Sequence, residues 1–360
     1  MLKAFRVPLG ITIAALAAVG AWRPGLVVVV LVLAVLEVSF SFDNAVINAK
    51  VLVRMSPFWQ RMFLTVGVLI AVFGMRLVFP LAIVAIGGHL SPVHAVDLAL
   101  NHADEYQRII ESKRAAIQTF GGVFLLMIFL DWLLGDKDIN WLVPLERAAE
   151  RVGRLSRVAI VILSAVLLVT SIGGPSHSQT SILFSGLAGL IAYLAVSATS
   201  DAFEEPDDDN VPDEQLAGGG ARRVASAGLG LFLYLEMVDA SFSFDGVIGA
   251  FAVTDNPIAI AVGLGVGAIY VRRLTIVMVQ RGVLEAYPHL DHGAHWAIGV
   301  LAVISLVAAT GTAVNEYVTG LVGVAFIGAA VLTSISQRRH ADADPDEAAA
   351  ERERSPASVR

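Results

Sequence analysis

The residues best suited to chemistry lie in a short pattern that the chain contains twice. Residues 37–50 read EVSFSFDNAVINAK and residues 239–250 read DASFSFDGVIGA, so the string SFSFD recurs, each time shortly after a carboxylate. Carboxylate, amide and hydroxyl oxygens are the ligands that hard cations such as Mg²⁺, Ca²⁺ and Mn²⁺ prefer. The sequence has no cysteine, which excludes thiolate ligands, iron–sulfur clusters and disulfides. The repeated pattern therefore indicates a site for a hard cation.

The acids of this pattern lie in segments that are otherwise apolar. Charged residues make up only 16% of the 360-residue chain and apolar types 56%, with a mean hydropathy of +0.72. Soluble domains carry about 25% charged residues, so this composition predicts an integral membrane protein. A charge near the centre of a bilayer costs about 2.5–3.5 kcal/mol on insertion scales, which makes such residues functional candidates. The candidates are Glu37, Asp43, Glu236, Asp239 and Asp245.

Helical periodicity places the two acids of the first copy on nearly opposite faces. A straight helix turns about 100° per residue, so it cannot bring Glu37 and Asp43 to one ion. We therefore expect a local break between residues 39 and 44; the alternative is that the two faces do different work. The residues that share these stripes are Ser41, Asn44 and Asn48 with Glu37, and Ser39 with Asp43.

A purely structural role is the alternative for each of these polar residues. Protonated or hydrogen-bonded acids, serines and asparagines can join helices within a bilayer without binding an ion. Glu236 has no equivalent in the first copy, which weakens its functional case. The serines remain open between ligation and helix packing: Ser39, Ser41, Ser241 and Ser243.

Two arginines and one further acid complete the candidates. Arg76 and Arg272 follow Gly67 and Gly263 at the same interval, so the repeat extends into the next segment of each half. These arginines are either counter-charges to the motif acids, closing the pathway when no cation is bound, or side chains that reach the membrane interface. Asp131 is either a third ligand or a residue at a helix end.

Ten apolar segments must position these residues. Each is close to the length that crosses a bilayer as a helix, which predicts an all-α transmembrane bundle of about nine to ten helices. Basic residues in the short connections place both termini in the cytoplasm, with the protein in the cell (inner) membrane. The first segment also resembles a signal peptide. The segments are 7–22, 25–49, 62–86, 118–135, 157–173, 181–198, 224–250, 258–280, 294–313 and 318–336.

The segments divide into two halves. Residues 1–173 form a first membrane repeat with an extramembrane loop at 87–117, and residues 181–336 form a second with an acidic hinge at 201–220. Residues 337–360 are predicted to be a disordered cytoplasmic tail. With this count the two motif helices run in opposite directions, so the repeats are inverted. Inverted repeats are typical of secondary transporters, whose substrate site lies near the bilayer midplane where the repeats meet.

The two motifs also carry a resemblance to a known family. The segments EVSFSFDNAV and EMVDASFSFDGVIGAF resemble the TerC-like integral membrane proteins, most closely a branch of unknown function neighbouring TerC within the LysE-type exporter group. The resemblance implies manganese efflux, with the metal ligands Glu37, Asp43, Asn44, Asp239 and Asp245. Gly246 stands where the second copy would match Asn44, which departs from the pattern.

The leading interpretation is therefore a secondary transporter that exports a divalent cation such as manganese, with the cation as substrate and no permanently bound cofactor. The expected partners are the lipid bilayer and this ion, and nothing indicates a nucleic acid. The alternatives are a LysE-like exporter of an amino acid or other small solute, and a membrane assembly factor that transports nothing. An enzyme is not expected, because GxGD, HExxH and paired Ser/His motifs are missing from the apolar segments.

Overall fold

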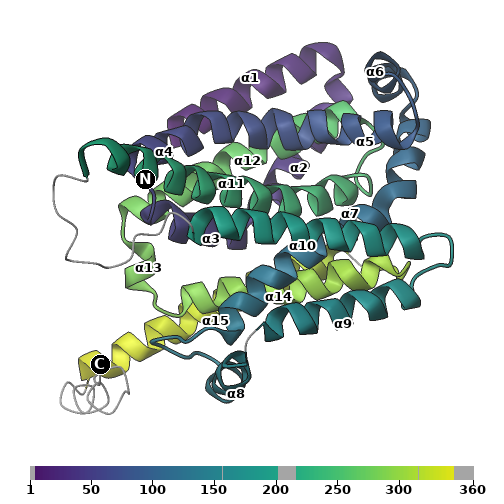
Figure 1. Cartoon of the computed structure of the whole chain (residues 1–360). Coiled ribbons are helices and arrows are strands. Elements are labelled where there is room, and N and C mark those ends of the chain that lie inside the picture. Colours follow the sequence, from purple (N-terminus) through teal and green to yellow (C-terminus); the bar gives the residue numbers. More distant parts are fainter. Residues whose placement is uncertain (1–4, 156, 202–215, 315, 344–360) are drawn as a thin grey trace.

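The computed structural model describes residues 5–155, 157–201, 216–314 and 316–343, and in these ranges the chain is a bundle of helices with no strand (Figure 1). The expected all-α polytopic bundle is confirmed. The first half contains α1 (Arg6–Trp22), α2 (Val27–Phe40), α3 (Phe42–Val53), α4 (Pro57–Met62), the π-helical segments η3 (Phe63–Gly67) and η4 (Ile70–Val78), α5 (Phe79–Gly87), α6 (Pro92–Asn101), α7 (Ala103–Leu134), α8 (Val143–Gly153) and α9 (Val158–Gly173). The second half contains α10 (Gln179–Asp201), α11 (Leu216–Ala250), α12 (Pro257–Gln280), α13 (Val283–Ala286), α14 (Leu290–Ala309) and α15 (Glu316–Ala343), and the 3-10 turn η2 (Pro24–Leu26) precedes α2.

The helices are long and apolar enough for a multi-pass membrane protein. Six continuous helical stretches among the described residues could cross a bilayer, and the number rises to eight if each of two bent helix pairs is one span. Helix α1 is a shorter apolar helix, and the 35-residue helix α11 contains the second copy of the SFSFD motif. Every one of the ten predicted apolar segments thus falls wholly or largely within a helix or a bent pair.

The predicted break in the first motif helix is confirmed. Helix α2 ends at Phe40, Ser41 leaves helical geometry, and α3 begins at Phe42 with its axis turned by 54°. The second copy differs, because α11 runs through its motif without interruption. The bend changes which side chains of α2 and α3 can face one cavity.

The structure adds detail to the expected boundaries. Residues 87–117, expected as an extramembrane loop, are largely helical and form the end of α5, α6 and the first half of α7. Of the acidic hinge, residues 202–215 lie outside the described residues, and 216–220 already belong to α11. The predicted tail begins later than expected, since α15 continues to Ala343, and residues 344–360 lie outside the described residues.

The two halves are arranged as inverted repeats. Helices α2 and α3 run toward the end of the bundle at which α4 and α13 lie, whereas α11 starts at that end and runs away from it (Figure 1). The helices that follow the two motifs, α5 and α12, also run in opposite directions, as do α7 and α14. The contacts between helices repeat as well. The contact of α2 with α12 corresponds to that of α11 with η4. The contact of α3 with α14 corresponds to that of α11 with α7. The repeated sequence therefore corresponds to a repeated structure.

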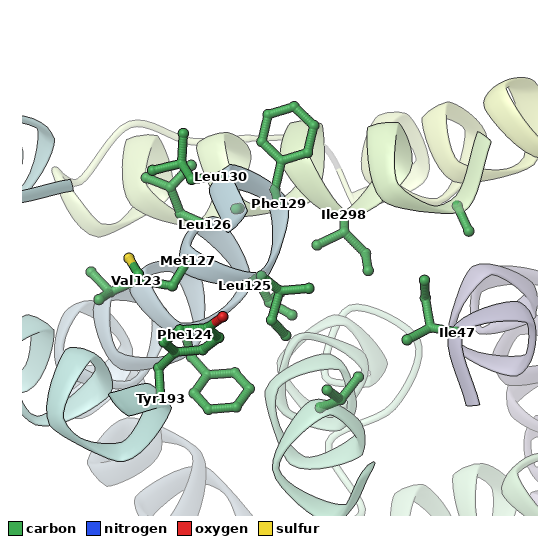
Figure 2. Packing of buried hydrophobic residues seen from close by; sticks show 14 of the residues in the cluster. Ile47, Val123, Phe124, Leu125, Leu126, Met127, Phe129, Leu130, Tyr193 and Ile298 are labelled. Carbon is green, nitrogen blue, oxygen red and sulfur yellow. The ribbon is translucent and has the colours of Figure 1, made fainter. Parts of the chain in front are cut away.

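The largest apolar core lies on α7 and joins the halves. Its residues Val123 to Leu130 are all buried, which is possible only because other helices surround this part of α7. Figure 2 shows these side chains between Tyr193 of α10, Ile298 of α14 and Ile47 of α3. This core fixes the helices that carry the polar residues described next.

Candidate functional site

A buried ion pair joins the first motif acid to the arginine of the next helix. The guanidinium of Arg76 donates to Glu37 Oε1, and both side chains are about 95% buried. Arg76 lies in the π-helical segment η4, and its Nη1 also donates to the carbonyl oxygen of Ala71 at 2.6 Å. Ser41, at the helix break, donates to the same Glu37 oxygen at 3.1 Å. Glu37 thus accepts hydrogen bonds from Ser41 at the helix break and from Arg76 of η4.

The second motif acid has the corresponding partners. Arg272 Nη2 lies 3.5 Å from Asp239 Oδ2, as Arg76 pairs with Glu37 in the first half. Asn44 donates across the repeat interface to Asp239 Oδ1 at 2.9 Å. Arg76 Nη1 lies 3.9 Å from Asp239 Oδ2 and so connects the two pairs. The repeat that the sequence shows is therefore also a repeat of ion pairs.

Gly246 explains the departure from the motif at the position that matches Asn44. A β-carbon at residue 246 would lie 3.3 Å from Glu37 Oε2. Asn44 contacts the acid of the second half, and Gly246 occupies the equivalent place beside the acid of the first half. Because glycine carries no side chain there, one oxygen of Glu37 remains uncovered on that side.

Glu236 extends the cluster along α11. Its Oε1 lies 3.1 Å from Arg272 Nη2, while Glu236 Oε2 has no hydrogen-bond partner among the described residues. Gly67 leaves the space for this pair, because a β-carbon there would lie 2.6 Å from Glu236 Oε1. The guanidinium of Arg272 also stacks 3.8 Å from the ring centre of Phe63. Both arginines are therefore buried counter-charges, and neither reaches the interface.

A cavity of about 130 Å³ lies beside this cluster. Glu37, Ser41 and Asp43 line it together, which a straight motif helix would not allow. Gln118 of α7 and Gly323 of α15 line it too, and a β-carbon at Gly323 would lie 3.3 Å from Asp43 Oδ2. Most of the remaining wall is apolar, with Leu33, Leu36, Phe40, Phe242, Leu264, Leu301 and Ile304.

The cavity extends toward the end of the bundle opposite to the one where α1 begins and α15 ends. Its lining includes Arg114 in the first half of α7, Val253 in the α11–α12 connection and Val314 in the α14–α15 connection. These two connections lie at the same end of the bundle in Figure 1. On the other side, α3 packs against α14 through buried apolar side chains, and Lys50 Nζ lies 2.8 Å from Asp291 Oδ2.

The remaining predicted residues are dispersed. The hydroxyls of Ser39, Ser241 and Ser243 each donate to a carbonyl oxygen of their own helix, which favours the packing role for all three. Asp131 accepts a hydrogen bond from Tyr193 and lies apart from the motif residues near the end of α7. The side chain of Asp245 lies outside the described residues, so its predicted role as a ligand stays a prediction.

Unpartnered polar atoms gather where the two motif helices meet. Both amide atoms of Asn48 and the Oδ1 atom of Asn44 are buried without a hydrogen-bond partner among the described residues. Asn48 follows Asn44 by one helical turn on α3, so these oxygens belong to one stripe. Buried polar atoms without partners are costly, and in native proteins they commonly bind water or an ion. The stripe can therefore offer oxygen ligands to a bound species.

Comparison with known proteins identifies one family. The family described as "Protein of unknown function (DUF475)" matches residues 42–341, which is most of the chain. The chain belongs to the DUF475 family. No curated protein and no solved structure matches this chain.

The DUF475 protein offers a cation few free carboxylates in this conformation. Among the side chains that the structure describes, no three His, Asp or Glu residues lie close enough together to hold a metal ion. In addition, Asp239 and Glu236 pair with Arg272, and Glu37 pairs with Arg76. Among the described side chains, the acids that line the cavity are Glu37 and Asp43, to which Ser41 adds a hydroxyl. A cation entering this site would be held by oxygen atoms and would compete with the arginines.

Sequence reasoning missed a second buried polar cluster, centred on Glu146 of α8. This side chain is fully buried, although it lies in a charged segment between two spans. Its carboxylate accepts from Trp296 Nε1 at 2.9 Å and lies 3.1 Å from His292 Nδ1. Burial raises the pKa of Glu146, but the hydrogen bonds from His292 and Trp296 outweigh it and lower the pKa to about 2. The sequence signal near this cluster is the spacing of His289, His292 and His295 at intervals of three residues.

Proposed function

We propose that this protein is a secondary transporter that moves a divalent cation such as manganese across the cell membrane. The observation that carries the proposal is the meeting of the two motif copies, with Asn44 of one half bonded to Asp239 of the other and Gly246 set against Glu37. Inverted repeats that meet at buried acids are the usual construction of transporter ion sites. The resemblance of the motifs to TerC-like proteins supports manganese as the ion and export as the direction.

In this proposal the cation enters the cavity and binds Glu37 and Asp43, with Ser41 as a further oxygen ligand. Arg76 then acts as a tethered counter-charge, which holds Glu37 when the site has no cation. The site reaches one end of the bundle and is separated from the other by the contacts of α3 with α14. A cavity that reaches one side only is the arrangement expected for one state of alternating access.

A second candidate function has its own supporting observation. The cavity wall is mostly apolar, and two carboxylates among the described side chains line it, so an organic ammonium ion with an apolar body would also fit. This is the small-solute exporter that the LysE-type resemblance allows. The two candidates share the site and differ in the substrate. A non-transporting assembly factor would move neither substrate.

The test is transport by the purified protein in sealed vesicles, with Mn²⁺ as the substrate and Mg²⁺, Ca²⁺ and lysine as competitors. Manganese uptake should exceed that of protein-free vesicles, and Asp43→Asn and Glu37→Gln should each lower it at least about tenfold, because each removes a ligand. Asp245→Asn tests the matching position of the second half. Ser39→Ala is the control within the motif, because this hydroxyl bonds only its own helix in the structure, and it should leave uptake unchanged.

The outcomes separate the candidates. Uptake of manganese that is equal in the parent and in both cavity variants would show that the proposed site is wrong. Uptake of lysine without competition by any divalent cation would favour the organic solute. If the parent moves neither manganese nor lysine above the protein-free vesicles, the transport proposal fails.

A further inference from the structure

Helix α8 lies at the level where two membrane-crossing helices end. It connects α7, which ends at Leu134, with α9, which begins at Val158, and its axis makes an angle of 104° with α9. Figure 1 shows α8 nearly end-on at the edge of the bundle, across the direction of the long helices. A helix that lies across the ends of its neighbouring spans is parallel to the membrane surface.

One side of α8 is fixed to the protein by acidic residues. Glu146 is fully buried against His292 and Trp296 of α14 and accepts from the backbone N–H of Trp141 at 2.9 Å. Glu150, one turn later, lies 3.7 Å from Lys137 Nζ. Both acids of the helix therefore face inward, where cations and donors compensate them.

The other side of α8 is basic and apolar. Arg147 and Arg151 are exposed and have no ion pair with any described residue. At about 100° per residue they form a stripe about 100–140° around the helix from Glu146, and Leu145 and Val152 form a second stripe about 100–120° from Glu146 in the other direction. Leu145 is 57% exposed and Val152 is 43% exposed. The helix thus has three sectors: an acidic one toward the protein, and a basic and an apolar one on the two sides of its outer surface.

This outer surface has the chemistry of a membrane-surface helix. Amphipathic helices of this kind bury their apolar stripe at the boundary of headgroups and acyl chains, while arginines contact lipid phosphates. Arg154 and Arg157 continue the positive charge beyond the helix toward α9 and are also exposed. In water alone the apolar stripe of Leu145 and Val152 would stay unfavourably hydrated. A neutral lipid would cover this stripe but would not neutralise the positive charge of the arginines.

We propose that the outer face of α8, formed by Arg147 and Arg151 with Leu145 and Val152, binds anionic phospholipids of the adjacent leaflet. The acidic anchor at Glu146 holds the helix in the orientation that presents this face. The binding does not depend on the proposed transport function, and it adds a lipid partner to the protein.

The test uses the full-length protein in lipid nanodiscs of an equimolar mixture of phosphatidylcholine and phosphatidylglycerol. Because the chain has no cysteine, Val152→Cys gives a single position for a fluorophore. A nitroxide quencher is placed on the acyl chains of either lipid, at equal mole fraction. Quenching by labelled phosphatidylglycerol should exceed quenching by labelled phosphatidylcholine. The preference should fall by about fivefold for each arginine removed, and vanish in the Arg147→Gln/Arg151→Gln variant.

Arg108→Gln is the matched control, because Arg108 is exposed on α7 at the opposite end of the bundle and should leave the preference unchanged. Equal quenching by the two lipids in the parent would overturn the proposal. So would the absence of quenching by both, which would indicate that water, a protein or a second copy covers this face. A preference that persists in the double variant would assign it to other residues and would also contradict the proposal.

Discussion

The carboxylate of Glu37 is compensated by one residue that is close in space and distant in sequence. Arg76 follows it by 39 positions and pairs with it where the two side chains are only 3% and 5% exposed. The pair Lys50–Asp291 is different, since its side chains are 43% and 26% exposed. Removing one partner of a buried pair leaves a buried charge without compensation, whereas an exposed pair contributes little.

We therefore expect Arg76→Gln to lower the free energy of unfolding by about 3–5 kcal/mol. Lys50→Gln should lower it by no more than about 1 kcal/mol, because water already solvates that pair. The double variant Glu37→Gln/Arg76→Gln should recover part of the loss, since it removes the charge that Arg76→Gln leaves behind. Denaturation of the purified protein in detergent measures all three. Equal losses for Arg76→Gln and Lys50→Gln would contradict the assignment of Arg76 as a buried counter-charge.

The contact of α12 with α2 depends on two glycines. A β-carbon at Gly263 would lie 2.6 Å from Leu33 Cβ, and one at Gly267 would lie 2.5 Å from Glu37 Cβ. These distances are too short for any side chain, so α2 approaches α12 only because both positions lack one. This is the close packing that a GxxxG pattern indicates in membranes. It positions Glu37, so the helix contact and the site are coupled.

Gly267→Ala should destabilise the protein by about 1–3 kcal/mol, because the added methyl group forces α2 away from α12. It should also lower manganese uptake in the vesicle assay, since Glu37 moves with α2. Gly328→Ala is the control on α15, where an added β-carbon meets no atom of the described residues within 4 Å. Unfolding in detergent and uptake are measured on both variants. If the two variants behave alike, the contact at Gly267 does not position Glu37.

The whole molecule has its two halves in opposite orientations and its cavity toward one end. Helix α1 begins, and α15 ends, at the same end of the bundle, and the cavity extends toward the other (Figure 1). If the basic connections place the termini in the cytoplasm, as the sequence predicts, the cavity faces the outside. An exporter in this state would have its site accessible from the side of release.

The orientation can be measured with single cysteines in the cysteine-free chain. Ser176, exposed between α9 and α10, lies at the cavity end, whereas Gln280, exposed at the end of α12, lies at the end where α15 finishes. A membrane-impermeant maleimide should label Ser176→Cys in intact cells and Gln280→Cys only after permeabilisation. The reverse pattern would place the termini outside. Labelling of both in intact cells would contradict the assignment of the two ends to opposite sides.

The sequence by itself determined the class of protein, the helical segments and the duplication, because hydropathy and the recurrence of SFSFD are local properties of the chain. It also located the break near Ser41, since only a bend lets Glu37 and Asp43 face one space. Only the tertiary structure decided which charges pair. Asn44 and Asp239 are 195 residues apart, and Glu146 reaches His292 across 146, so both contacts depend on how helices pack. Helical periodicity gives the face of a residue but not the helix opposite to it, and for that reason Arg76 and Arg272 could be assigned as buried counter-charges only from the fold.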